Sequence, residues 1–159
     1  EHEGPVYIRL FRRQAENVFD DDYEFDLGKA DLLRDGSDVT LIASGVCVAN
    51  ALQAAETLAQ EGVSARVLNI HTIKPIDADA VIKAASETGA LVTAENHNVI
   101  GGLGSAVAEV LAEQRPTPLE RVGVKDHFGQ VGKAPYLMGV FGITAADIAK
   151  AARKAIARK

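Results

Sequence analysis

The amino-acid sequence predicts a three-layer α/β/α fold, in which helices cover both faces of a mostly parallel sheet of about five strands with one antiparallel strand at an edge. Short apolar runs of strand length alternate along the chain with longer segments whose apolar side chains recur at helical spacing. Glycine or proline stands at most junctions between these segments. Such alternation is typical of βαβ units, because two parallel strands need a long crossover connection.

The predicted strands are short and mostly apolar. A strand over residues 29–33 precedes an Asp35-Gly36 turn, and a buried strand over residues 39–43 follows it. We expect these two strands to pair as an antiparallel hairpin across the turn. The first of them would then lie at an edge of the sheet, antiparallel to the rest. Further strands are predicted over residues 65–70, 91–94 and 119–124.

Helices are predicted between these strands. One over residues 48–60 ends at Gly62, and another begins at the capping residue Asp77 and ends at Gly89. A glycine turn over residues 101–105 precedes a third helix that starts at Leu103. A short apolar helix is predicted around residues 136–140.

The last helix is predicted from residue 144 onward. The Thr144 hydroxyl can cap it, and Asp147 three residues later completes a capping box. Basic side chains gather toward its carboxyl end, where they suit the helix dipole and need no nucleic acid to explain them. One stripe of this helix is apolar and is expected to be buried: Ile148, Ala152, Ala155 and Ile156.

Composition argues against several classes of protein. The chain has 159 residues, of which 47% are hydrophobic, and this is enough for one sizeable core. No apolar run approaches the roughly 20 residues of a membrane-spanning helix, so no membrane span is expected. Cys47 is the lone cysteine and cannot form an internal disulfide, which favours a reducing, cytoplasmic location.

The chain is predicted to have three parts. Residues 1–15 contain an alternating strand in which Val6, Ile8 and Leu10 share one face, and Arg12 follows it. Residues 16–28 form an acidic linker, and residues 29–159 form the α/β domain. Six acidic residues of the linker account for the net charge of −5, so the remainder is nearly neutral, which argues against a nucleic-acid surface. The start at Glu1 rather than at methionine suggests a piece of a longer polypeptide.

Polar side chains follow three predicted strands. Ser44 follows the strand over residues 39–43, Asn69 and His71 close the next, and Glu95, Asn96 and His97 come after an apolar run that is expected to end at Ala94. In a parallel sheet these residues meet at the carboxyl edge, where α/β folds place ligands or partner surfaces. Two interpretations stay open at this point: the residues line a functional surface, or they only cap the strands.

The glycine turn resembles the start of a dinucleotide-binding GxGxxG motif, and it invites an anion-binding interpretation. Gly102 and Gly104 fit, but Val107 occupies the third glycine position, so the fingerprint fails and a tight packing turn is favoured. No metal site is expected, because His71, His97 and His127 stand in separate loops. Cys47, at the start of a helix, is interpreted as a packed small hydrophobe rather than a nucleophile.

Two arginines near the first strand suggest anion binding. The planar guanidinium groups of Arg9 and Arg12 can clamp a phosphate, and they can equally pair with the acidic linker. Spacing alone does not decide between these alternatives.

Four motifs occur in a family order that spans nearly the whole chain. They read GPVYIRLFR at residues 4–12, HTIKPID at 71–77, AENHNVIGGLGSAV at 94–107, and GKAP at 132–135 followed by FGIT at 141–144. With this ordered set the chain resembles the C-terminal portion of transketolases, especially the split, two-subunit form. It is more distantly similar to the C-terminal domain of the beta subunits of pyruvate-dehydrogenase-type enzymes.

The resemblance implies a thiamine diphosphate enzyme that transfers a two-carbon ketol unit between sugar phosphates in the pentose phosphate pathway. The cofactor and a divalent metal would lie between two other domains, so this chain would bind neither alone and would supply no catalytic residue. Residues 1–15 would be the last strand of the pyrimidine-binding domain, linked to a transketolase C-terminal domain at 29–159. The implied partners are an N-terminal transketolase subunit or domains, in a homodimer or heterotetramer.

The resemblance also implies roles for individual residues. Arg12 matches a substrate-phosphate arginine, with Arg9 as its neighbour. Glu95, Asn96 and His97 match a polar lip that contacts other domains, and helices such as the one over residues 103–112 would add apolar interface area. Two alternatives remain: the C-terminal domain of a 2-oxoacid dehydrogenase-type or deoxyxylulose-phosphate synthase-type enzyme, and a stand-alone anion- or nucleotide-binding module that uses the glycine turn.

Overall fold

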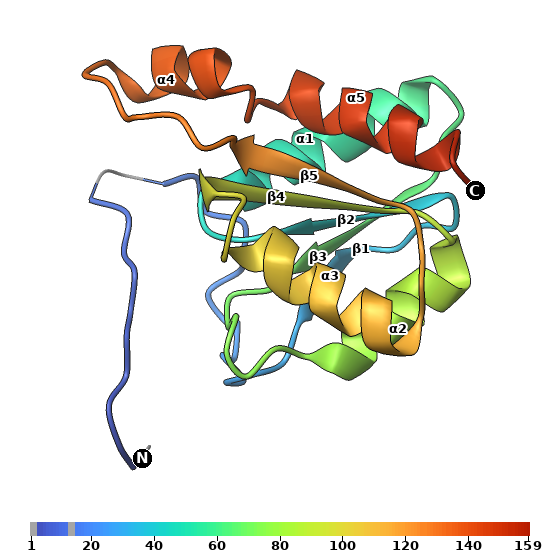
Figure 1. Cartoon of the computed structure of the whole chain (residues 1–159), viewed down its shortest axis with the longest axis horizontal. Helices are drawn as coiled ribbons and strands as arrows, with labels where there is room; N and C mark the ends of the chain where they lie inside the picture. The colour runs from blue at the N-terminus through green and yellow to red at the C-terminus, as the bar shows by residue number, and fades with distance from the viewer. Residues whose placement is uncertain (1–2, 13–14) are drawn as a thin grey trace.

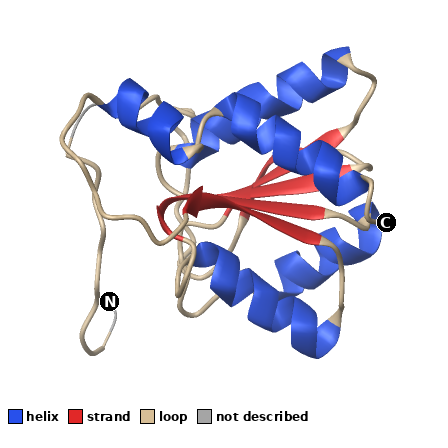
Figure 2. Ribbon diagram, turned by 45° about the horizontal axis from the view of Figure 1, so that its top comes forward, coloured by secondary structure: helices blue, strands red, loops and turns tan. Residues whose placement is uncertain are grey.

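A computed structural model describes residues 3–12 and 15–159 of the chain, and it has the predicted three layers (Figures 1 and 2). A five-stranded sheet in the order β1-β3-β2-β4-β5 forms the middle layer. Its strands are β1 (Asp31–Arg34), β2 (Val39–Ala43), β3 (Ala65–Asn69), β4 (Leu91–Asn98) and β5 (Leu119–Val124). The helices are α1 (Cys47–Gln60), α2 (Ala78–Thr88), α3 (Leu103–Gln114), α4 (Ala134–Phe141) and α5 (Ala145–Ile156).

Two apolar cores form because successive strand residues point to opposite faces of the sheet. On one face, Leu41 of β2 and Val92 of β4 pack with α1 and α5; on the other, Ile42 and Leu91 pack with α2 and α3. The predicted stripe of α5 follows this arrangement, since Ile148, Ala152 and Ala155 are buried and Ile156 is half-buried. The short helix α4 has no fully buried residue and lies beyond the sheet (Figure 1).

The local end signals of two helices are confirmed. The Asp77 carboxylate accepts a hydrogen bond of 3.1 Å from the Ala80 amide at the start of α2, and Gly89 closes that helix in the left-handed conformation. At the start of α5, Thr144 and Asp147 form the predicted capping box. In each cap the bonded residues, Asp77 with Ala80 and Thr144 with Asp147, are three positions apart, so the sequence alone is enough to identify them.

The edge strand β1 is antiparallel, as predicted, but it pairs with β3 rather than with β2. The predicted hairpin is wrong because β2 already has a parallel neighbour on each side, β3 and β4. The connection from β1 instead lies against the start of β3, where Ser64 O accepts hydrogen bonds from the Ser37 and Asp38 amides. Gly36 is needed there, since a Cβ atom would come within 2.4 Å of the Ala65 backbone.

Strand β4 is longer than predicted. The apolar run stops at Ala94, but the strand continues to Asn98, and its register against β5 shifts between Ala94 and Asn98. The Val99 amide then donates to Val124 O at 2.9 Å, which holds the extension in place. The polar residues 95–97 therefore belong to the strand itself, because a polar side chain that has hydrogen-bond partners can lie within a sheet.

Residues 3–12 form an extended arm that stands apart from the domain (Figures 1 and 2). The arm has no paired strand among the described residues, so the strand predicted at residues 6–11 is absent here, because a strand needs a neighbour to pair with. Its place as the last strand of another domain stays a prediction, and Arg13 lies outside the described residues. Val6, Tyr7, Ile8 and Leu10 are 61–87% exposed.

Part of the acidic linker packs against the domain. Val18 packs against the core of the α1 and α5 face, and the rings of Phe19 and Tyr23 stack with centroids 3.9 Å apart. The Tyr23 hydroxyl donates to the Asp31 carboxylate at 3.1 Å, which connects the linker to β1. Within residues 3–12 and 15–159, no helix has the length and apolar character needed to cross a membrane.

Candidate functional site

The predicted polar rim forms at the carboxyl edge of the sheet. In the sheet register Ala43 of β2 lies opposite both Asn69 of β3 and Ala94 of β4, so the residues that follow these positions meet at one edge. All four parallel strands point toward this edge, and the arm and α4 lie on the same side of the molecule (Figure 1). The convergence of Ser44, His71 and residues 95–97 that the sequence predicts is therefore present.

Glu95 is buried at this edge, and its carboxylate turns into the domain. Only 2% of the residue is exposed, and its two oxygens accept hydrogen bonds of 2.8 Å each from the Leu103 and Gly104 amides at the start of α3. A negative group suits the positive end of the helix dipole. Gly102 permits this approach, because a Cβ atom there would lie 1.9 Å from Glu95 Oε2.

This arrangement decides how the glycine turn is used. The amides that a phosphate would need at the start of α3 already donate to Glu95, so an anionic ligand would have to displace a buried carboxylate. The stand-alone anion- or nucleotide-binding interpretation is therefore disfavoured, and the tight packing turn is what the structure contains. An interface role for Glu95 stays a prediction.

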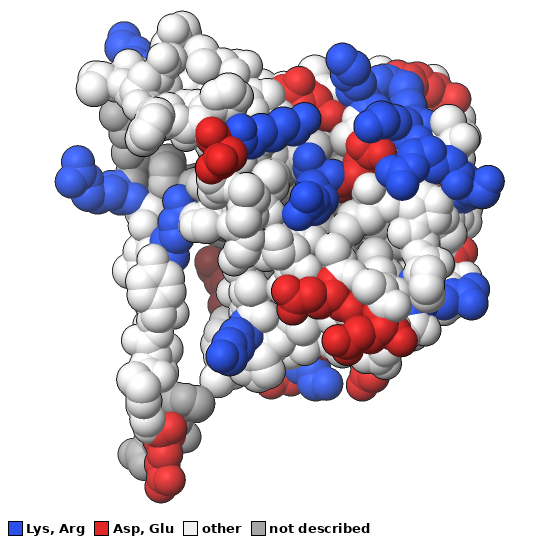
Figure 3. Space-filling view, viewed as in Figure 1, with Lys and Arg blue, Asp and Glu red and all other residues white. Residues whose placement is uncertain are grey.

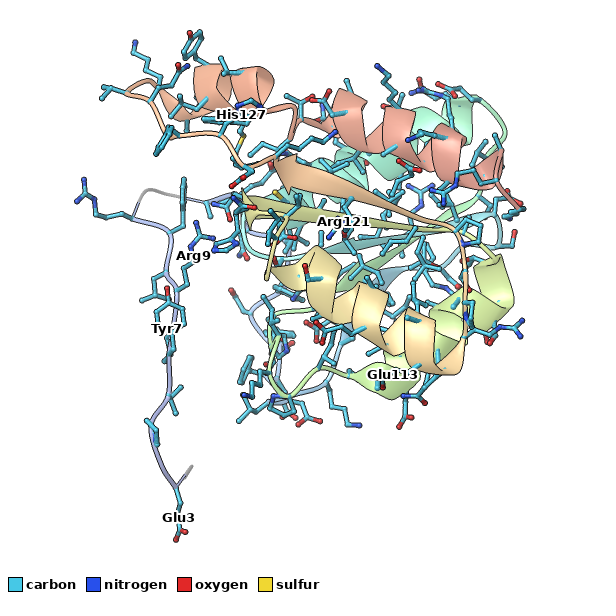
Figure 4. All side chains as sticks on the ribbon, in the orientation of Figure 1. Glu3, Tyr7, Arg9, Glu113, Arg121 and His127 are labelled. Atoms are coloured by element: carbon cyan, nitrogen blue, oxygen red, sulfur yellow. The ribbon has the colours of Figure 1, made fainter. Side chains whose placement is uncertain are left out.

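Asn96, the next residue, is bound by the arm. Arg9 Nη1 donates to Asn96 Oδ1 at 2.8 Å, and Arg9 Nη2 donates to the Asn96 backbone oxygen at 3.0 Å. The Arg9 side chain reaches from the arm toward the tip of β4 (Figure 4). Two residues expected to act separately, one on substrate and one at an interface, are thus in direct contact. Their positions differ by 87 residues, so no local sequence signal could have revealed the pair.

The other predicted residues of this region are accessible. Arg12 is exposed at a bend of the chain, and His97 is about half-exposed at the end of β4. His97 Nδ1 lies 2.8 Å from Asn98 O, and it donates there because a carbonyl oxygen can only accept. His97 Nδ1 also lies 3.9 Å from Glu95 Oε2. Roles for Arg12 in phosphate binding and for His97 at an interface stay predictions.

A second polar cluster connects β1, β3 and the linker; the sequence pattern indicated Asn69 and His71 of this cluster, but not Asp31 or Tyr23. The Asp31 carboxylate accepts hydrogen bonds from the Tyr23 hydroxyl at 3.1 Å and from Asn69 Nδ2 at 2.8 Å. Burial raises the pKa of Tyr23, and the hydrogen bond to Asp31 raises it further. His71 Nε2 is buried without a hydrogen-bond partner and lies 3.9 Å from Asp31, while the ring contacts Phe25.

Cys47 and the histidines show no arrangement for nucleophilic or metal chemistry in the described residues. Burial raises the pKa of the Cys47 thiol to about 12, and the negative charge of Glu95 adds to the effect, so the thiol stays protonated at neutral pH. This confirms that Cys47 is a packed small residue. The described ranges contain no group of three or more His, Cys, Asp or Glu side chains that could hold a metal ion.

Exposed apolar side chains lie close to the same edge of the sheet. The predicted contribution of α3 to an interface is wrong for its apolar face, since Leu103, Val107 and Leu111 are buried in the domain core. The exposed residues are instead on the loops after β4 and β5 and on α4: Ile100, Phe128, Val131, Tyr136 and Val140. The arm is a largely uncharged strip in the space-filling view (Figure 3). Exposed apolar surface of this kind is typical of protein interfaces.

Comparisons with known proteins agree with the fold and the motifs. Residues 28–148 match the family model described as "Transketolase, C-terminal domain". A 6-deoxy-6-sulfo-D-fructose transketolase subunit from Clostridium sp. (strain MSTE9) is 58% identical, with 99% of this chain and 49% of the relative covered. An apulose-4-phosphate transketolase subunit from Phocaeicola vulgatus is 42% identical, with 93% of this chain and 47% of the relative covered.

A solved structure, described as a split-gene transketolase in an inactive beta4 tetramer, superposes with a TM-score of 0.94. It is 48% identical, and the match covers 98% of this chain and 51% of the other. The chain therefore spans about half the length of the curated relatives it matches. On the family model, the relatives and the fold together, the chain belongs to the transketolase C-terminal domain family.

Proposed function

We propose that the chain is the C-terminal part of a thiamine diphosphate-dependent transketolase, which moves a two-carbon ketol unit between sugars that carry an anionic end group. The cofactor and its divalent metal would be bound by the missing domains, where they supply the chemistry that breaks and forms the carbon–carbon bond. The described residues of this chain do not fit the cofactor or its metal. They form no cluster that could hold a metal ion, and the Glu95 carboxylate is already bound to α3.

The observation that carries this proposal is the exposed arm next to the carboxyl edge. Its apolar side chains Val6, Tyr7, Ile8 and Leu10 are 61–87% exposed, although apolar side chains on an extended segment are normally covered by a neighbouring strand or helix. An N-terminal transketolase subunit or domain that adds a sheet next to the arm would cover them. We therefore propose an oligomer, a homodimer or heterotetramer, in which this chain is inactive without those domains.

Arg12 is the residue that we propose to bind the substrate. It is exposed at the end of the arm. The arm itself lies on the side of the molecule where the strands of the domain end (Figure 1). A guanidinium group binds a phosphate or a sulfonate through paired hydrogen bonds, so it orients the substrate without transferring a proton. Both groups occur in the names of the relatives, one of which acts on a sulfo-sugar and the other on a sugar phosphate.

Reconstitution tests the proposal. The chain would be combined with the polypeptide that supplies the missing domains, thiamine diphosphate and Mg²⁺, and assayed for ketol transfer from a ketose phosphate to glyceraldehyde 3-phosphate. We expect transfer by the complex and none by either component alone. Oxidative decarboxylation of a 2-oxoacid, or condensation of pyruvate with glyceraldehyde 3-phosphate, would instead identify a dehydrogenase-type or deoxyxylulose-phosphate synthase-type enzyme. Turnover by the isolated chain would overturn the proposal.

A further inference from the structure

The arm is attached to the domain through one side chain. Among residues 3–12 and 15–159, the hydrogen bonds between the arm and the rest of the chain are the two that Arg9 donates to Asn96. One reaches the side-chain oxygen of Asn96 and the other its backbone oxygen, so the guanidinium plane is held at two points. Two parallel bonds from a planar group fix its direction as well as its position, which a single ammonium group cannot do.

The acceptor of these bonds is well anchored. Asn96 is part of β4, and its neighbour Glu95 is buried and bound to the first amides of α3. The Arg9 contact therefore connects the arm to a rigid point of the sheet, whereas the apolar side chains on either side of Arg9 are exposed.

The same contact separates the roles of the two arginines. Both Nη atoms of Arg9 are engaged by Asn96, so the fork that would grip a phosphate is already in use. Arg12 stands three residues further along, which is about 10 Å of extended chain. A rotation of the arm about its anchor would move the Arg12 guanidinium by several ångströms, and a displacement of about 1 Å is already harmful in a substrate site.

We infer that Arg9 is a positioning residue, which anchors the arm on Asn96 and so places Arg12 for binding the anionic end of the substrate. The inference rests on the proposed function, in which Arg12 makes that contact. It replaces the expectation that Arg9 itself touches the substrate.

Kinetics of the reconstituted enzyme separates positioning from direct binding. Glyceraldehyde 3-phosphate and glyceraldehyde are the two acceptors, and the variants are Arg9→Gln, Asn96→Ala, Arg12→Ala and the double variant Arg9→Gln/Arg12→Ala. If Arg9 positions Arg12, both Arg9→Gln and Asn96→Ala raise KM for the phosphorylated acceptor by about fivefold, the size expected when the net contribution of about one ordinary hydrogen bond is lost. Neither change affects the unphosphorylated acceptor, and Arg9→Gln adds nothing to Arg12→Ala.

Direct binding gives the opposite pattern and would overturn the inference: Asn96→Ala is silent, and the losses of Arg9→Gln and Arg12→Ala multiply. Arg153→Ala is the matched control, because Arg153 is also an exposed arginine with a two-point contact, to Glu61 at the far end of the domain. It should leave both KM values unchanged.

A second measurement needs no activity. In the purified chain, limited chymotrypsin digestion at Tyr7 and Phe11 reports how firmly the arm is held. Cleavage should be several times faster in Arg9→Gln and Asn96→Ala than in the wild-type chain and in Arg153→Ala. Equal cleavage rates in all four proteins would contradict the conclusion that the Arg9–Asn96 contact holds the arm. Absence of ketol transfer in the reconstituted wild-type enzyme would instead count against the proposed function, so the two failures are distinguishable.

Discussion

Replacement of Glu95 by glutamine tests the internal role of this side chain. The substitution keeps the shape but turns one acceptor oxygen into an NH₂ group, which would face an amide N–H at the start of α3. A hydrogen bond to a charged group contributes about 1.5–3 kcal/mol, and the interaction with the helix dipole contributes up to about 1 kcal/mol more. We therefore expect Glu95→Gln to lower the free energy of unfolding by about 2–4 kcal/mol.

Urea denaturation followed by circular dichroism measures this loss. With a slope of about 2 kcal/mol per molar urea, typical of small domains, the unfolding midpoint should fall by about 1–2 M. Glu56→Gln is the control, since it makes the same chemical change at an exposed position of α1. Equal midpoints for the two variants would refute the conclusion that Glu95 fixes α3 to the sheet.

Three further predictions concern the substrate arginine, the thiol and an ion pair. Arg12→Ala in the complete enzyme should raise KM for a phosphorylated acceptor far more than for its unphosphorylated analogue, because only the first has an anion to bind; equal losses would contradict the assignment. Because the pKa of Cys47 is raised to about 12, iodoacetamide at pH 8 should label the folded chain far more slowly than the urea-unfolded chain, as mass spectrometry would show; similar rates would exclude a buried thiol. Although burial raises the pKa of Glu120, hydrogen bonds from Lys154 and Arg158 outweigh it and lower the pKa below its usual value. Its stabilising effect should thus be present at neutral pH and lost on acidification through the lowered pKa, so Glu120→Gln should lower the urea midpoint at pH 7 but not near pH 2.

The elements that the sequence predicted well depend on nearby residues. The Thr144 cap and its partner Asp147 are three positions apart, and the buried stripe of α5 repeats within a few turns, so both can be identified from short segments. The pairing partner of β1 could not be identified from a short segment. Strand β3 lies between β1 and β2, and this strand order is a property of the whole sheet.

The candidate site, too, could be predicted from the sequence only where it depends on neighbouring residues. Polar letters at residues 95–97 correctly indicated the carboxyl edge, but Glu95 is buried and Asn96 is engaged by the arm. Whether a carboxylate faces water or two backbone amides is decided by the turn that returns the chain to it, and that turn is visible only in three dimensions. The Arg9–Asn96 contact likewise needed the fold, because it joins the two ends of a long stretch of chain.

The exposed apolar arm should make the newly synthesised chain prone to association with other chains. An extended apolar segment whose backbone N–H and C=O groups have no partner strand is a site where strands of other chains can add. Copies of this chain in which the arm is not yet covered by another domain can therefore associate with one another. If the proposed N-terminal subunit covers the arm, synthesis of the two chains in equal amounts would shorten the time for which the arm is exposed, and an excess of this chain would favour its self-association.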